Sequence, residues 1–223
     1  MSKSNESSNA TVLYNKKDKI GTIKINRPKV NALRIEEFKK MIKFIKESDR
    51  NTDIHVVRIC SSGDRVFTGG LDLQMLSELG AAPENIPNLL EVGYEMVRTM
   101  LQCKKPIVVQ VQGPAVAWGT ILCLAADFVI AGENPRTFFS LNEIDVGIFP
   151  GTGALTLALY SLGLRQAKRI LMIPERIYLD KAEEIGIVTK QCSLDSLEQT
   201  TLEFCQSLAD KPQNILIQIK AVL

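Results

Sequence analysis

Residues 67–73 of this chain read FTGGLDL and residues 113–119 read GPAVAWG, two glycine-containing segments that each follow an apolar strand-like run and precede a helix-like one. Backbone N–H groups at such turns, and at the helix N-termini that follow them, are favourable donors to an oxygen that carries negative charge. The two segments therefore predict a site at which paired N–H groups meet one oxygen.

Strand-like and helix-like patterns alternate on both sides of these segments. Alternation from Thr11 to Asn26, with a turn around residues 15–19, predicts a hairpin. Apolar residues at helical spacing then predict an amphipathic helix from Ile35 to about Asp49. Further along, the patterns predict strands at 54–60, 107–111, 128–131 and 137–141, and helices at 71–79, 88–102 and 120–126.

Helices fill the last third of the chain. The patterns there predict helices at 152–161, 164–172, 180–185, 194–209 and from 213 onward, with a short strand at 187–190. This order indicates an α/β fold with a helical C-terminal region. We predict a disordered tail at residues 1–10, a core at 11–192 and a C-terminal helical region at 193–223.

The composition argues against several classes of protein. The 223 residues include 27 Lys and Arg against 25 Asp and Glu, and the basic residues are scattered, unlike those of a nucleic-acid binder. The first ten residues lack the features of a signal or transit peptide, and no apolar run is long enough for a membrane span. Five cysteines without a C-x-x-C pair favour reduced thiols, so we expect a soluble cytoplasmic protein. The single histidine, His55, is expected to be structural, which leaves no basis for a His-built triad or metal site.

Four motifs in order resemble those of the crotonase superfamily, the enoyl-CoA hydratases and isomerases. They are INRPKVNAL at 25–33, FTGGLDL at 67–73, the stretch from Lys105-Pro106 to Asp127, and LNEIDVGIFPG at 141–151. The resemblance runs from about Val12 to the last residue. It implies a crotonase-like spiral of ββα units and acyl-CoA thioester substrates, with no cofactor besides the coenzyme A of the substrate.

The resemblance also implies which residues form the site. The matching N–H donors for a thioester oxygen are those of Leu71 and Trp118, although many members of the family have glycine at the position of Trp118. The Trp118 ring either reshapes the acyl pocket or serves as a core residue. Residues expected to bind the substrate or its CoA portion are Lys29, Val30, Gly69, Gly70, Asp72 and Gly119; for Lys29 a solvated turn, and for Asp72 a role in fixing the loop, are alternatives.

Two positions commonly carry glutamates in the hydratases of this family, and here they differ. Ile121 stands at the first position and Glu143 at the second, so half of the pair that water addition needs is missing. A single carboxylate suffices for a double-bond shift, as in the Δ3,Δ2-enoyl-CoA isomerases that the chain also resembles. We therefore predict an isomerase with Glu143 as acid and base; the alternatives are an enoyl-CoA hydratase and a non-catalytic acyl-CoA-binding relative. Asp145 is a weaker candidate for a second acid.

The family resemblance extends to assembly. Members usually continue past the positions of Lys220 to Leu223 with one or two more helices, which pack against a neighbouring subunit and help to close the acyl pocket. This chain stops within an apolar helix-like run, and we interpret it as a short member or a fragment. The resemblance implies a homotrimer or a dimer of trimers, and the early stop puts that assembly and the pocket lid in question.

Overall fold

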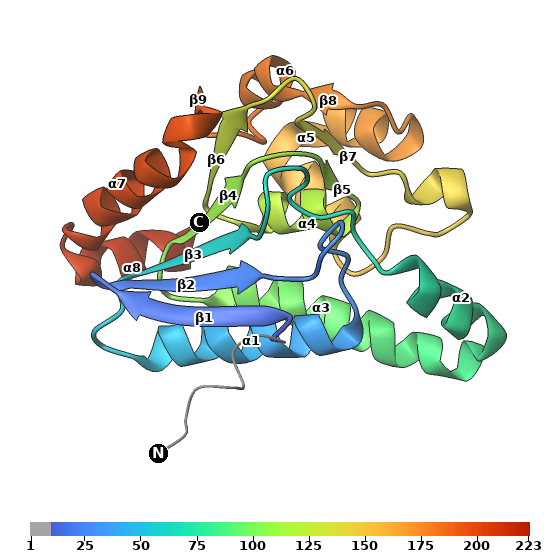
Figure 1. Cartoon of the computed structure of the whole chain (residues 1–223), viewed down its shortest axis with the longest axis horizontal. Helices are drawn as coiled ribbons and strands as arrows, with labels where there is room; N and C mark the ends of the chain where they lie inside the picture. The colour runs from blue at the N-terminus through green and yellow to red at the C-terminus, as the bar shows by residue number, and fades with distance from the viewer. Residues whose placement is uncertain (1–9) are drawn as a thin grey trace.

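A six-stranded sheet, with a three-stranded sheet beside it, forms the centre of the computed structural model, which describes residues 10–223 (Figure 1). The tail predicted at the N-terminus lies outside the described residues, apart from Ala10. The large sheet has the order β1-β2-β3-β4-β6-β9, and the small one has the order β5-β7-β8. The strands are β1 Val12–Lys17, β2 Ile20–Ile25, β3 Val56–Ser61, β4 Ile107–Val111, β5 Ala115–Val116, β6 Phe128–Glu133, β7 Phe138–Ser140, β8 Ile177–Tyr178 and β9 Lys190–Ser193.

The first two strands form the predicted hairpin. β1 and β2 pair antiparallel, and the turn between them consists of Asp18 and Lys19, both with positive φ (51° and 66°). Positive φ at both central residues is typical of the type I′ turn, whose twist suits a two-residue hairpin. From β2 onward every neighbouring pair in the large sheet is parallel.

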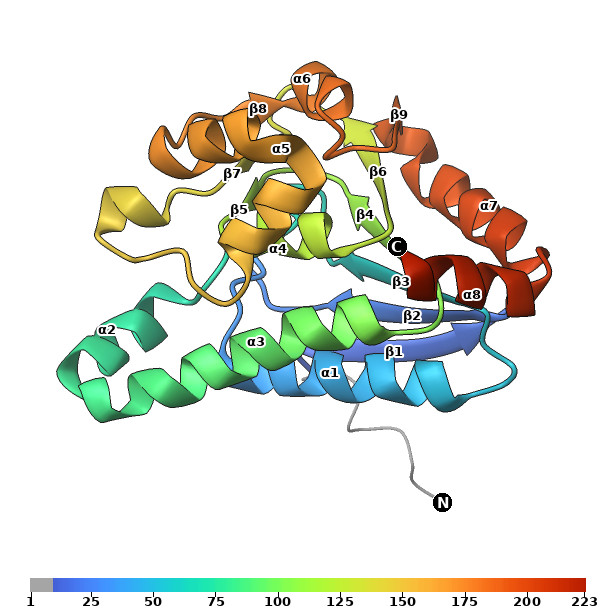
Figure 2. The ribbon, with the colours of Figure 1, turned by 180° about the vertical axis from the view of Figure 1, so that it is seen from behind.

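Helices cover both faces of the large sheet. Successive residues of β3 pack on opposite faces of the sheet. Val57 packs in the main core with residues of α1 and α3, and its neighbour Val56 packs in a second core with residues of α7. Figure 2 shows α1 and α3 lying side by side along one side of the sheet. The helices are α1 Ile35–Arg50, α2 Leu73–Ala81, α3 Ile86–Gln102, α4 Trp118–Ala125, α5 Ala154–Met172, α6 Leu179–Glu184, α7 Leu197–Ala209 and α8 Gln213–Val222, with short 3₁₀ helices at Pro83–Asn85 (η1), Glu143–Val146 (η2) and Leu194–Ser196 (η3).

Most predicted elements are present, and the differences have local causes. The two helices expected at 152–161 and 164–172 form one element, α5, which is kinked at Gly163 (φ 74°, ψ 163°). The strand expected at 187–190 lies instead at 190–193, because residues 187 and 188 pack into the main core before the chain joins the sheet. β5 and β8 have no counterpart among the predicted strands, since two residues are too few to show a period.

Candidate active site

The two glycine-containing segments lie side by side. Val116 N–H donates to the Thr68 carbonyl at 3.0 Å, and Phe67 N–H donates to the Pro114 carbonyl at 3.0 Å. Gly70 has a φ of +88°, and a Cβ placed there would lie 3.0 Å from the Val116 carbonyl oxygen and 3.5 Å from the Trp118 nitrogen. Only glycine allows this approach without strain, and the approach brings the two predicted donors close together.

The direction of the Leu71 N–H is set by a short parallel bridge to Leu33. Leu33 N–H donates to the Gly70 carbonyl at 2.7 Å, and Asp72 N–H donates to the Leu33 carbonyl at 2.9 Å. Successive residues of an extended chain direct their N–H groups to opposite sides, so the Leu71 N–H is directed away from Leu33. Within residues 10–223 it has no hydrogen-bond acceptor.

The second donor is at the start of α4. Trp118 is the first residue of this helix, and its N–H also lacks an acceptor among the described residues. The residue before it, Ala117, has φ 49° and ψ −110°, a conformation that a non-glycine residue rarely adopts, and its own N–H donates to the Ser140 carbonyl at 2.8 Å. Such strain persists where the surroundings enforce it and is often found at functional sites. The helix dipole of α4 adds partial positive charge at the Trp118 N–H.

Both donors line a largely apolar cavity of about 330 Å³. Its walls come from α2, α3, α4 and the segment from η2 to the start of α5. The apolar side chains that line it are Leu71, Leu73, Leu76, Leu79, Ile86, Leu89, Leu90, Val116, Ala117, Trp118, Ile121, Val146, Ile148, Phe149 and Pro150. A cavity of this kind, with a few polar groups in an apolar wall, is typical of a small-molecule site.

Among the described residues that line the cavity, Glu143 is the only titratable one. It begins η2, and its Oε2 atom is buried without a hydrogen-bond partner among the described residues. Burial raises the pKa of the Glu143 carboxyl above its ordinary value, and the hydrogen bond from its own backbone N–H offsets only part of that rise. A carboxyl with a buried, unpaired oxygen and a raised pKa is suited to accept a proton from a ligand.

Trp118 and Ile121 form part of the cavity wall and of the core. The Trp118 ring is 4% exposed and lies against Phe38 with the ring centroids 4.6 Å apart. A Cβ at Gly93 of α3 would lie 2.9 Å from Trp118 Cζ2, so the ring fills the space between α1 and α3. The ring is therefore a core residue that also lines the cavity. Ile121 is 2% exposed and brings no polar atom to the cavity.

Of the residues expected to bind substrate, only Gly69 lies in the cavity wall. Val30 accepts the Gly69 N–H on its carbonyl at 2.9 Å, and Lys29 lines a separate hollow of about 150 Å³. Gly119 is buried against Thr68, where a Cβ would lie 2.9 Å from Thr68 Cγ2, so its role is close packing of α4. Asp145 is exposed and does not line the cavity. The structure therefore does not place Asp145 in the cavity wall with Glu143.

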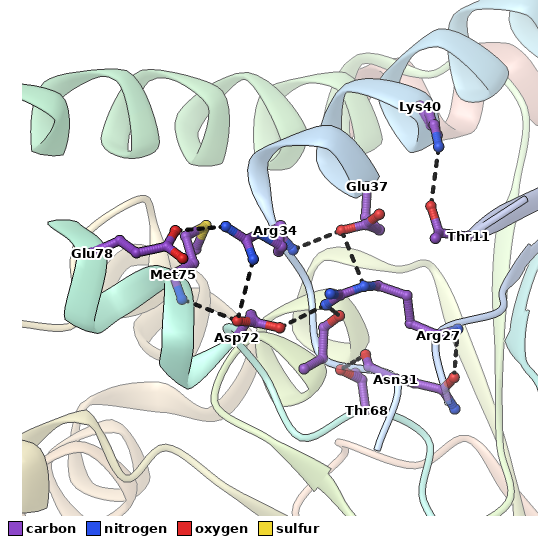
Figure 3. Close-up of polar contacts among 11 residues, drawn as sticks. Thr11, Arg27, Asn31, Arg34, Glu37, Lys40, Thr68, Asp72, Met75 and Glu78 are labelled. Carbon is purple, nitrogen blue, oxygen red and sulfur yellow. Dashed lines mark hydrogen bonds and ion pairs between the residues drawn. The ribbon is translucent and has the colours of Figure 1, made fainter. Parts of the chain in front are cut away.

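Asp72 also points away from the cavity, into a cluster of charged side chains shown in Figure 3. It accepts the Met75 N–H at 3.0 Å and thereby caps α2, which explains why that helix begins at Leu73 and not at the predicted Leu71. Arg27 donates to its other oxygen at 2.9 Å. The role in fixing the loop that we considered for Asp72 agrees with these contacts.

Sequence reasoning missed Arg27 and the strained Ala117. Arg27 belongs to the motif at 25–33, but the pattern around it indicates only the end of a strand. No residue-type signal marks Ala117, because alanine is not the residue that favours positive φ.

The remaining sequence predictions concern features away from the cavity. His55 Nδ1 contacts the Ala209 carbonyl oxygen at 2.8 Å, in agreement with a structural role. Within the part of the chain that the structure describes, no three His, Cys, Asp or Glu side chains are grouped as metal ligands. No helix among residues 10–223 is both long and apolar enough to cross a membrane. All five cysteines are free thiols, and four of them are buried.

Comparison with known proteins agrees with this fold, which is that of the crotonase superfamily. Residues 15–223 match the model of the Enoyl-CoA hydratase/isomerase family, so the chain belongs to this family and is an enzyme of it.

Individual relatives carry different activities in their names. The chain is similar to the short-chain-enoyl-CoA hydratase of Clostridium acetobutylicum, with 28% identity over 88% of this chain and 74% of that protein. It is similar to the trans-2-decenoyl-(acyl-carrier-protein) isomerase of Streptococcus mutans, with 28% identity over 85% of this chain and 72% of that protein. A solved enoyl-CoA hydratase/isomerase of Xanthobacter autotrophicus Py2 superimposes with a TM-score of 0.87 at 25% identity, over 96% of this chain and 78% of that one. Hydratases and isomerases are thus both represented.

Proposed function

We propose that this protein is an enoyl-CoA isomerase that converts a 3-enoyl-CoA into a 2-enoyl-CoA, with Glu143 as its single acid and base. The observation that carries the proposal is the makeup of the cavity wall. Among the described residues it contains one titratable side chain, Glu143, whose Oε2 atom is buried, and apolar Ile121 stands where, by the family resemblance, hydratases carry a second carboxylate.

The proposed reaction moves one proton along the acyl chain. The Glu143 carboxylate takes a proton from C2 of the 3-enoyl thioester, and the electron pair of that C–H bond forms the C1–C2 double bond of a dienolate. The negative charge rests on the thioester oxygen, where the N–H groups of Leu71 and Trp118 donate to it. The protonated Glu143 then returns the proton to C4, which restores the carbonyl and leaves the double bond between C2 and C3. No water enters and no net charge changes.

The physical reason for two amide donors is electrostatic. Dienolate formation places negative charge on an oxygen that is only polarised in the substrate, so donors fixed beforehand favour the transition state over the ground state. Removing one donor of this kind typically lowers the rate by a factor of about 10² to 10³. The strained Ala117 and the Leu33 bridge are the features that fix them here.

Water addition is the second candidate, because one of the relatives named above is a hydratase. It would require Glu143 both to activate water and to manage the proton at C2, or a second acid that the described cavity wall lacks. We therefore rank it below the isomerase.

The test is to incubate the protein with 3-hexenoyl-CoA and follow formation of 2-hexenoyl-CoA, with 2-butenoyl-CoA as a parallel substrate for hydration. We expect isomerisation to exceed hydration, and the Glu143→Gln variant to lose isomerisation while still binding the thioester. Full turnover in Glu143→Gln would reject the assigned base. Thioester binding without turnover in the wild type would favour a non-catalytic acyl-CoA-binding protein.

Assembly into a trimer stays a prediction of the family resemblance. Several large apolar side chains near the cavity and along α5 are exposed, among them Phe149, Tyr160 and Leu164. Large exposed apolar side chains of this kind are common at protein interfaces, which supports association of subunits.

A further inference from the structure

We propose that Arg27 is a positioning residue for the Leu71 N–H donor, through a charge-assisted link between the loop at 26–34 and the segment at 67–73. The inference rests on the role proposed above for Leu71. Arg27 lines no part of the cavity wall, so its effect on the reaction would be indirect.

The Arg27 guanidinium joins the two segments at one point. Its Nη1 atom donates to Asp72 Oδ2 at 2.9 Å and to the Ala32 carbonyl at 2.7 Å, while Nε lies 3.8 Å from Glu37 Oε2 (Figure 3). Asp72 directly follows Leu71, and Ala32 directly precedes Leu33. The guanidinium therefore contacts Ala32 and Asp72, the residues next to the two partners of the bridge, Leu33 and Leu71.

That bridge alone is small. It consists of two hydrogen bonds, Leu33 N–H to the Gly70 carbonyl and Asp72 N–H to the Leu33 carbonyl, outside any named strand. A net hydrogen bond contributes only about 1 kcal/mol, so an isolated bridge can shift or open. Hydrogen bonds to charged groups are roughly twice as strong as those between neutral groups, so the Arg27 contacts restrain the bridge more than its own two hydrogen bonds do.

Each partner of Arg27 is itself anchored. The other oxygen of Asp72 caps α2 through Met75, and Arg34 lies 3.9 Å from it. Burial by itself would raise the pKa of Asp72, but the Met75 N–H and the Arg27 guanidinium outweigh it and hold that pKa below the ordinary value. Glu37 is buried and accepts the Arg34 N–H at 2.9 Å. Arg27 thus contacts both Glu37, in the first turn of α1, and Asp72, the residue that caps α2 and directly follows Leu71.

The side chains are sheltered enough for the link to matter. Arg27 is 24% exposed, Asp72 17% and Glu37 4%, unlike the exposed surface pairs that contribute little. The geometry also favours arginine over lysine, because a planar guanidinium meets several acceptors at once whereas an ammonium is a point charge.

The experiment uses a chromophore so that it does not depend on turnover. The conjugated thioester 2,4-hexadienoyl-CoA absorbs at longer wavelength when hydrogen bonds polarise its carbonyl, and the size of the red shift on binding reports the two N–H donors. We expect Arg27→Gln to lose at least half of the wild-type shift, with Arg27→Lys intermediate. The kcat for 3-hexenoyl-CoA should fall about 10- to 100-fold in Arg27→Gln, less than for loss of a donor, with KM changed less than about threefold.

Two further variants separate positioning from general stability. Arg98→Gln removes an arginine that pairs with Glu95 on the surface of α3, and it should keep both the shift and kcat. Asp72→Asn retains an oxygen that can cap α2 but weakens the pair with Arg27, so it should reduce the shift as Arg27→Gln does. It decides the question if Arg27→Gln fails to fold. The double variant Arg27→Gln with Asp72→Asn should lose no more than the larger single loss, because both changes break the same link.

The outcomes for the two proposals are distinguishable. A wild type that shifts the chromophore but does not isomerise would reject the isomerase and leave the role of Arg27 standing. A full red shift in folded Arg27→Gln, or in folded Asp72→Asn, would overturn the inference. A wild type that binds 2,4-hexadienoyl-CoA without any shift, or does not bind it, would overturn the donor role of Leu71 and this inference with it.

Discussion

Replacing Gly70 with alanine should damage both stability and catalysis, because this glycine lies where the two glycine-containing segments meet. Its φ of +88° costs a residue with a Cβ about 1–2 kcal/mol. The new methyl would also lie 3.0 Å from Ala117 Cβ and 3.0 Å from the Val116 carbonyl oxygen, and such overpacking typically costs a further ~1–3 kcal/mol. We therefore expect a loss of about 2–5 kcal/mol in the free energy of unfolding, measured with urea.

The same methyl should separate the two amide donors. The atoms that must give way are those of Val116 and Ala117, directly before Trp118, so relief of the clash moves the Trp118 N–H away from the Leu71 N–H. If one donor is displaced, kcat for 3-hexenoyl-CoA should fall by a factor of about 10².

Gly186→Ala is the matched control for this prediction. Gly186 has nearly the same φ, +86°, but a Cβ there meets nothing within 4 Å, and it lies between α6 and β9, away from the cavity. It should lose only about 1–2 kcal/mol and keep the wild-type kcat. Equal losses of stability in the two variants, or an unchanged kcat in Gly70→Ala, would refute the reasoning.

Three other substitutions test the site. Burial raises the pKa of Glu143, so the contribution of this group to the stability of the wild type is highest at acid pH and falls as pH rises through the folded-state pKa. Glutamine does not titrate, so the difference in Tm between Glu143→Gln and wild type should grow in favour of the variant from about pH 4.3 toward neutrality. A Tm difference that does not change with pH would contradict this prediction. Ile121→Glu should add a second carboxylate to the cavity, lower the free energy of unfolding by about 3 kcal/mol and give measurable hydration of 2-butenoyl-CoA, which Ile121→Gln should not give. Thr68→Val removes a buried hydroxyl that donates to the Asn31 carbonyl at 2.7 Å and accepts the Gly70 N–H at 3.1 Å, so it should cost about 1–3 kcal/mol in urea unfolding and lower kcat, whereas Thr68→Ser should restore both.

Much of the fold could be predicted because the sheet and its main helices carry strong periodic signals. The strand at Ile107–Val111 and the hairpin are confirmed, and α1 differs from its prediction by one residue at its end. In each case burial dictates the residue pattern over five residues or more, as a continuous apolar run in the strand and as a spaced apolar face in α1. Elements fixed by contacts distant in sequence, such as β5 and β8, leave no such pattern.

For the candidate site, too, the sequence predicted some features and not others. Glu143, Leu71 and Trp118, which the family resemblance proposes as base and donors, line one cavity, whereas Asp72, Gly70 and Gly119 do not line it. A motif match marks positions of the site but does not give the direction in which each side chain points. That information depends on the pairing of separate segments, which one local motif cannot contain.

The pairing of Leu33 with Leu71 constrains the number of residues in the segment from Asn26 to Leu33. Along an extended segment N–H groups and side chains alternate in direction, so shifting the chain at 26–33 by one residue against 70–72 would reverse its own groups and break the two hydrogen bonds that Leu33 makes there. Insertion or deletion of a single residue between Asn26 and Leu33 should therefore displace the backbone at Leu71, the proposed donor, although it changes no residue that lines the cavity.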